Sequence, residues 1–338
     1  MRQIYDLELK KIQQVVIDNQ YQKILLQMPE GMLDTPLKSV LEELSSLGVQ
    51  VIVAGDPSYG YCDLAIDLAT RLGCNLLIHF GHTNFTFEHK IQTKHEKALD
   101  ILEIPAFVTI KISSYFNQLL RRLEQLKWAN IGLVATAQHL KNLEELKSYL
   151  DSKKINNDVL GTGQILGCHV QNAIGFSKDV DGIISLHAGH FHTRGLLLST
   201  ILPVLQLDPF TGEMTLFLED ERNELIQKRH GVIQKARSAG TWGVLGSSKI
   251  GQYNPGQISR VEKILMNHNK FMVTLIAENL DPPHLLNLPW VDAWVDTACP
   301  RLAVDDQLSF EKPIVTFKEF LYLFDEVSWE RILATGFF

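Results

Sequence analysis

The sequence predicts an α/β fold of three similar units, each a small, mostly parallel four-stranded sheet with flanking helices. Two observations support this. Short apolar runs alternate with amphipathic segments along the chain, as in parallel sheets covered by helices. The alternation also restarts, since the first strand of each round begins near residues 24, 131 and 243. Offsets of 107 and 112 residues match an ordinary domain size. The alternative is one large doubly wound sheet without internal symmetry.

The first predicted unit covers residues 1–125. Its first helix begins at Thr35 and Pro36, where a capping hydroxyl precedes a proline suited to the first helical turn. Gly48 ends this helix. A second helix is expected over residues 63–73. Apolar runs predict four strands, at 23–28, 49–55, 75–81 and 106–112.

The second and third units are predicted over residues 126–238 and 239–338. Each contains one long amphipathic helix, at 139–150 and at 257–268. A second-strand region leading to Cys168 is expected in the second unit. The other predicted strands are 131–136, 182–189 and 203–209 in the second unit, and 242–248, 271–277, 293–299 and 313–317 in the third.

Composition limits the function classes. The chain of 338 residues has a net charge of −7, which disfavours broad electrostatic attraction to nucleic acid or anionic membranes. The N-terminus lacks the apolar core of a signal peptide. No apolar run approaches the roughly 20 residues that a membrane helix needs. We therefore expect a cytoplasmic protein.

The four cysteines are scattered and form no CxxC pair, which excludes a zinc ribbon or a local redox motif. Cys62 and Cys168 follow the second-strand regions of their units, and Cys299 follows the third strand of its unit. The carboxyl ends of parallel strands are where open sheets bind ligands. Cys74 precedes a strand and is expected to be a packing residue. Three thiolates suit an iron–sulfur cluster or zinc, with His169 as a possible fourth zinc ligand; three unrelated buried thiols are the alternative.

Short motifs occur in order over almost the whole chain: LLQMPEG (25–31), YGYCD (59–63), LIHFGH (77–82), ATAQH (135–139), LGCHV (166–170), LDPF (207–210), QKRH (227–230), SKIGQ (248–252) and ACPRLAVDD (298–306). Together they resemble the archaeal diphthamide synthase family, the 2-(3-amino-3-carboxypropyl)histidine synthases of the first step of diphthamide biosynthesis. The chain departs from the family pattern at His169, after Cys168, and at Phe210, where a tyrosine is expected.

The resemblance implies three homologous domains, usually in a homodimer, arranged around a central cluster site, where Cys62, Cys168 and Cys299 hold a 4Fe-4S cluster. It also implies use of S-adenosylmethionine (SAM) without the CxxxCxxC signature of ordinary radical SAM enzymes. One-electron reduction would cleave the Cγ–S bond of SAM, giving methylthioadenosine and a 3-amino-3-carboxypropyl radical. The radical would add to C2 of a histidine on translation elongation factor 2. The electron donor is of unknown identity.

Several residues are candidates for binding SAM. Glu30 is equally well explained by a plain turn, and Arg301 by an ion pair with Asp305 or Asp306. The segment 247–252 is a candidate carboxylate loop and is not a Walker loop. The candidates are Gln27, Glu30, Gly31, His82, His139, Ser248, Lys249, Gly251, Gln252 and Arg301.

His187, His190 and His192 are candidate proton acceptors for the substrate imidazole. A zinc site there is the weaker interpretation, because HExxH spacing is absent. Lys228 and Arg229 are candidates for contact with the protein substrate, the alternative being a solvated helix face.

Three other functions remain open. One is a quinolinate synthase-like 4Fe-4S dehydratase, which shares the plan of three domains and three cysteines. The others are a non-catalytic scaffold subunit that carries a cluster, and a binding protein stabilised by zinc.

Overall fold

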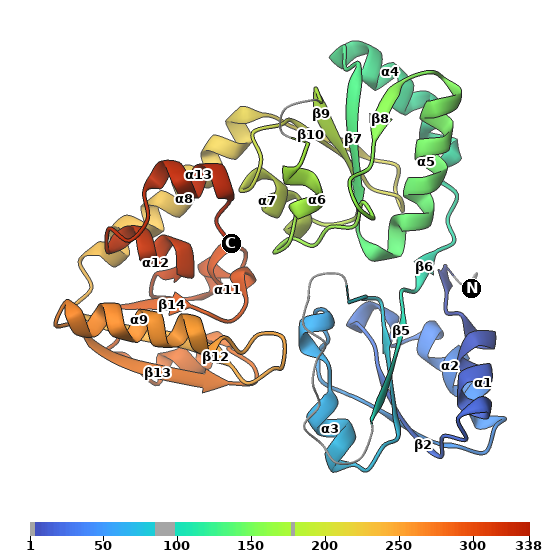
Figure 1. The fold of residues 1–338 in the computed structure, drawn as a ribbon, viewed down its shortest axis with the longest axis horizontal. Coiled ribbons are helices and arrows are strands. Elements are labelled where there is room, and N and C mark those ends of the chain that lie inside the picture. The colour runs from blue at the N-terminus through green and yellow to red at the C-terminus, as the bar shows by residue number, and fades with distance from the viewer. Residues whose placement is uncertain (1–3, 85–98, 177–179) are drawn as a thin grey trace. The chain divides into compact units, whose positions relative to one another are not determined.

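The computed structural model describes residues 4–84, 99–176 and 180–338 (Figure 1). It divides into two compact units: unit 1 comprises Met1–Ser114 and Ala135–Leu146, and unit 2 comprises Tyr115–Val134 and Lys147–Phe338. The described strands form three sheets of four or five strands and one two-stranded sheet. No helix in the described ranges is long and apolar enough to cross a membrane.

The first sheet lies in unit 1 and is parallel, with the order β3-β2-β4-β5. Alternate strand residues face opposite sides, so Leu26 and Ile78 pack with α1 and α2, whereas Leu25 and Leu77 pack with α3. The strands are β2 (Lys23–Gln27), β3 (Gln50–Val53), β4 (Leu76–Phe80) and β5 (Asp100–Ile104). The helices are α1 (Leu9–Asp18), α2 (Thr35–Ser45) and α3 (Ile66–Arg71), with 3₁₀ turns at η1 (Glu30–Met32) and η2 (Tyr61–Asp63).

The predicted strand at 106–112 is wrong. The fourth strand of this sheet is β5, which ends immediately before Pro105. Proline cannot donate to a strand ladder, and Ala106 has a left-handed φ of 53°, so the chain leaves the sheet there. The short β6 (Phe107–Val108) instead pairs antiparallel with β1 (Tyr5–Asp6).

The second sheet has the order β11-β10-β9-β7-β8, with β11 antiparallel at its edge. It therefore has five strands, not the predicted four, because Met214–Phe217 returns alongside β10. The strands are β7 (Asn130–Ala135), β8 (Asn156–Asp158), β9 (Gly182–Leu186), β10 (Val204–Leu207) and β11 (Met214–Phe217). The helical segments are η3 (Ile112–Tyr115), α4 (Phe116–Leu126), η4 (Ala137–His139), α5 (Leu140–Ser152), α6 (Gln171–Ile174), α7 (Phe191–Leu197) and α8 (Glu219–Arg237).

The third sheet, in unit 2, is parallel with the order β13-β12-β14-β15. Ile233 of α8 packs with Trp242 and Phe320 in the core beside it. The strands are β12 (Thr241–Ser247), β13 (Phe271–Ala277), β14 (Ala293–Asp296) and β15 (Ile314–Thr316). The helical segments are α9 (Pro255–Asn267), α10 (Pro282–Leu286), α11 (Pro300–Val304), η5 (Gln307–Ser309), α12 (Phe317–Leu323) and α13 (Trp329–Thr335).

One strand order recurs in these three sheets: the first strand lies between the second and the third. Such an order creates a switch point, where the connections from neighbouring strands leave in opposite directions and ligands usually bind. The switch points lie between β2 and β4, β7 and β9, and β12 and β14. The predicted α/β class with mostly parallel sheets is confirmed. The three-unit division stays a prediction, since the compact units are two.

Candidate functional site

The cysteines differ in their surroundings. Cys62 lies in η2, Cys168 in a tight turn and Cys299 immediately before α11, and each is half-buried. Cys74 is buried in the apolar core beside α3, which confirms its predicted packing role, and burial raises the pKa of its thiol. In the described ranges no cysteine is part of a disulfide.

The turn that carries Cys168 is held by backbone and by helix packing. Leu166 and His169 exchange two backbone hydrogen bonds of 2.9 and 3.0 Å, which places Gly167 and Cys168 at the tip. A Cβ atom on Gly167 would lie 2.7 Å from the ring of Phe191. A Cβ atom on Gly195 of α7 would lie 2.0 Å from the carbonyl oxygen of Gly167. Helix α7 therefore packs directly on the Cys168 turn.

Gly195→Ala is expected to destabilise the protein by about 1–3 kcal/mol, because the new methyl group meets backbone atoms that must move. The change in free energy of unfolding can be measured by urea denaturation. Gly231→Ala in α8 is the matched control: its Cβ meets nothing within 4 Å. Removing a glycine from a helix interior stabilises by about 0.5–1 kcal/mol. Equal effects of the two substitutions would contradict the close packing of α7.

The segment that carries Cys299 is fixed at the β12/β14 switch point. Asp296 Oδ1 accepts hydrogen bonds from the backbone N–H groups of Ala298 and Cys299, at 2.8 and 3.1 Å. Thr297 Oγ1 donates to the Leu245 carbonyl of β12 at 2.7 Å. Burial raises the pKa of Asp296 to about 7, against the opposing effect of these backbone hydrogen bonds.

Helix α7 also contacts α11, which follows Cys299. Arg194 of α7 forms an ion pair with Asp305. The guanidinium of Arg301 lies over the Phe191 ring, 5.7 Å from its centroid, and its Nε is 3.9 Å from Asp306. The predicted ion pair of Arg301 is therefore made with Asp306. Within unit 2, α7 joins the segments of Cys168 and Cys299.

A row of polar side chains crosses the first sheet at the carboxyl ends of its strands. Gln27 is the register partner of His79, and His79 is the register partner of Glu103. Gln27 Oε1 lies 2.9 Å from His79 Nδ1 and accepts the Ala65 N–H at 3.1 Å. Gln27 Nε2 donates to the Asp63 carbonyl at 2.6 Å. The row is therefore bonded to the segment that carries Cys62.

His82 extends this row, with its Nδ1 3.1 Å from His79 Nε2. Burial, together with the charge of His82, lowers the pKa of His79 to about 3, and burial lowers that of His82 to about 4. Tyr61 packs edge-on to His79, and burial and Glu103 raise the pKa of its hydroxyl. Gln27 and His82 were predicted from the sequence, whereas His79 was not. Strand alternation was the available signal: Phe80, the next residue of β4, packs in the core with α1 and α2, so His79 faces the other side of the sheet.

The other predicted residues of unit 1 are not part of this row of polar side chains. Glu30 and Gly31 are exposed in η1. His139 is buried in η4, with Nδ1 3.2 Å from Asn142 Oδ1. Its neighbour Gln138 donates to the Gly81 carbonyl at 2.5 Å, beside His82.

The predicted loop 248–252 and the predicted histidines of unit 2 lie at two switch points. Ser248, Lys249, Gly251 and Gln252 form the loop after β12, where Ser247 Oγ accepts the Lys249 N–H at 3.1 Å.

His187 is buried after β9, and its ring lies 5.1 Å from that of His192, whereas His190 is exposed. Gln206 donates to the carbonyls of His187 and Gly189, at 3.3 and 3.2 Å, which fixes this loop.

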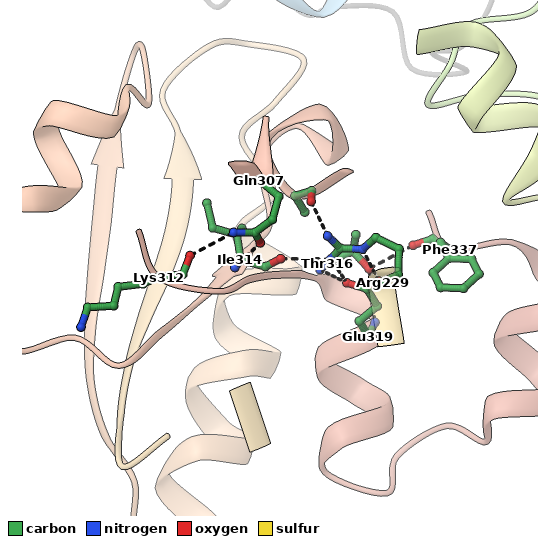
Figure 2. A network of polar contacts seen from close by, with 8 residues as sticks. Arg229, Gln307, Lys312, Ile314, Thr316, Glu319 and Phe337 are labelled. Atoms are coloured by element: carbon green, nitrogen blue, oxygen red, sulfur yellow. Dashed lines mark hydrogen bonds and ion pairs between the residues drawn. The ribbon is translucent and has the colours of Figure 1, made fainter. Parts of the chain in front are cut away.

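The predicted role of Arg229 in contacting a protein substrate is wrong, and so is its alternative as a solvated residue. Its side chain is 3% exposed and forms a buried ion pair with Glu319 of α12. It also donates to the carbonyls of Ala303 in α11 and Ile314 in β15 (Figure 2). Lys228, one residue earlier, is exposed and pairs with Glu224 at 2.6 Å.

In the part of the chain that the structure describes, no group of three or more His, Cys, Asp or Glu side chains is gathered for a metal ion. The thiols of Cys62, Cys168 and Cys299 nevertheless suit an iron–sulfur cluster in type and exposure, and each lies in a segment fixed by hydrogen bonds or packing. The ligand set stays a prediction.

Comparisons with known proteins identify the family. A family model described as "Putative diphthamide synthesis protein" matches residues 28–333. The chain is 30% identical over 326 residues to 2-(3-amino-3-carboxypropyl)histidine synthase of Pyrococcus horikoshii, covering 92% of this chain and 89% of that protein. It is 29% identical over 342 residues to subunit 1 of the synthase of Mus musculus, covering 99% and 75%.

A crystal structure of Dph2 from Pyrococcus horikoshii with a 4Fe-4S cluster matches with a TM-score of 0.83 and 26% identity, covering 96% of this chain and 92% of that one. The family model spans most of the sequence, and the fold agrees over nearly all of it. The resemblance seen in the motifs is thus confirmed, and the chain belongs to the diphthamide synthesis protein family.

Proposed function

We propose that this protein is a 2-(3-amino-3-carboxypropyl)histidine synthase that catalyses the first step of diphthamide biosynthesis. It transfers the 3-amino-3-carboxypropyl group of SAM to C2 of a histidine on translation elongation factor 2 and releases methylthioadenosine. The observation that carries the proposal is the likeness, over nearly the whole chain, to a Dph2 solved with a 4Fe-4S cluster.

Cys62, Cys168 and Cys299 are the proposed ligands of a 4Fe-4S cluster. Their half-buried thiols are reachable, unlike that of Cys74, which lies in an apolar core. When bound and reduced, such a cluster supplies the single electron that cleaves the Cγ–S bond of SAM.

The chain's own residues bind and orient the reactants. Arg301 remains a candidate for the SAM carboxylate, because this half-buried cation lies in the first turn of α11, which begins directly after Cys299. The loop of Ser248 and Lys249 is the second candidate. The histidines of 187–192 accept the proton lost from the substrate imidazole, and exposed Lys228 contacts the protein substrate. We further propose a cytoplasmic homodimer that receives electrons from a separate donor.

Anaerobic purification tests the proposal. Iron and sulfide should be present, with the optical and EPR spectra of a 4Fe-4S cluster, and the reduced protein should consume SAM. A colourless, zinc-containing protein would instead support a zinc-stabilised binding protein. A cluster without SAM consumption would support a scaffold subunit or a quinolinate synthase-like dehydratase.

A further inference from the structure

The amide of Gln27 has one orientation in the buried row. Its Nε2 donates to the Asp63 carbonyl at 2.6 Å, and its Oε1 accepts the Ala65 N–H at 3.1 Å. Exchanging oxygen and nitrogen would set two donors against each other at Ala65 and two acceptors at Asp63. The oxygen must therefore face His79.

The position of the hydrogen on each imidazole follows from that oxygen. His79 Nδ1 is 2.9 Å from Gln27 Oε1, which only accepts, so Nδ1 carries the hydrogen. With its pKa lowered to about 3, His79 is neutral at pH 7 and its Nε2 bears a lone pair. His82 Nδ1, 3.1 Å away, must then donate to it. His82, also neutral with a pKa near 4, is left with a lone pair on Nε2.

We propose that Gln27 and His79 are positioning residues that fix His82 as a hydrogen-bond acceptor at Nε2, and that this nitrogen binds the ammonium group of an amino-acid ligand. Under the proposed function, on which this step rests, the ligand is SAM and the group is its α-ammonium.

The charges around the row favour a ligand whose hydrogen-bond donor is a cation. A neutral imidazole does not repel the sulfonium and ammonium of SAM, as an imidazolium would. Glu103 lies beside His79 in the sheet and interacts with the Tyr61 hydroxyl, so the described residues of the row include a carboxylate and no cationic side chain.

Gln27 has a second consequence, because its backbone partners Asp63 and Ala65 flank Leu64, and Asp63 follows Cys62 directly. One side chain thus sets both the tautomer of His82 and the conformation of the chain next to a proposed cluster ligand. Loss of Gln27 should affect both.

Nitrogen-15 NMR of histidine-labelled full-length protein tests the tautomers without any ligand. We expect His79 and His82 to be neutral with the hydrogen on Nδ1, unchanged between pH 7 and pH 5, with signals assigned from His79→Gln and His82→Gln. Gln27→Leu should release His79 from this tautomer, whereas Gln14→Leu, on the exposed face of α1, should not. An Nε2–H tautomer or a protonated ring at either position in the wild-type protein would overturn the inference.

Anaerobic calorimetry of the cluster-loaded protein tests the ligand, with SAM and an analogue lacking the α-amino group as probes. His82→Phe should weaken SAM binding about tenfold or more, since a hydrogen bond to a charged group is lost, and leave the analogue unaffected. An equal effect on both probes, or none on SAM, would overturn the inference. Absence of SAM binding by the wild-type protein would instead overturn the proposed function.

Discussion

Cys299→Ala is expected to lose the iron–sulfur cluster and all transfer activity, while Cys74→Ala keeps both. A 4Fe-4S cluster needs a thiolate at each protein-ligated iron, and alanine supplies none. Cys74 lies in the apolar core beside α3, so its replacement removes only packing atoms. Iron and sulfide per chain, measured with the optical spectrum after anaerobic reconstitution, distinguish the variants.

Cys62→Ala and Cys168→Ala should behave as Cys299→Ala does. Far-ultraviolet circular dichroism serves as the control for folding, since each of the three segments is held by contacts that do not involve its sulfur atom. A full complement of iron in any of the three variants, or its loss from Cys74→Ala, would refute the ligand assignment.

Arg229→Met is expected to destabilise the protein by about 3–5 kcal/mol, the cost of leaving one member of a buried ion pair without its partner. Glu319 is fully buried opposite it, and the carbonyls of Ala303 and Ile314 lose a donor (Figure 2). Ala303 belongs to α11, so the substitution should also loosen the helix that follows Cys299. Urea denaturation at pH 7 measures the change.

Lys228→Met is the matched control, because Lys228 is exposed and its solvent-screened pair with Glu224 contributes little to stability. The double variant Arg229→Met with Glu319→Leu should recover much of the stability, since no buried charge is left unpaired. A loss below about 1 kcal/mol for Arg229→Met would contradict this expectation, because it would show that another group compensates the buried charge of Glu319.

The sequence predicted most strands because buried parallel strands are continuous apolar runs. It failed where that signal was weak or misleading. The strand at Asp100–Ile104 carries two acidic residues, whereas the stretch 106–112 is richer in β-branched residues but follows a proline. The edge strand Met214–Phe217 is short and half-exposed, so it lacks the apolar run of a buried strand.

The site was predicted from motifs, and its polar contacts were not. His79 meets Gln27 through a strand register that joins residues 52 positions apart, which periodicity does not reveal. Arg229 looked like a solvated residue because its partner Glu319 lies 90 positions away. Contacts between distant segments decide both cases.

Transfer of the 3-amino-3-carboxypropyl group can be measured directly from its two products. Reduced, cluster-loaded protein should be incubated anaerobically with SAM and elongation factor 2, and the products separated by chromatography and mass spectrometry. The predicted result is methylthioadenosine together with a mass gain on one histidine of the factor. Formation of 5′-deoxyadenosine, or an unmodified factor, would contradict it.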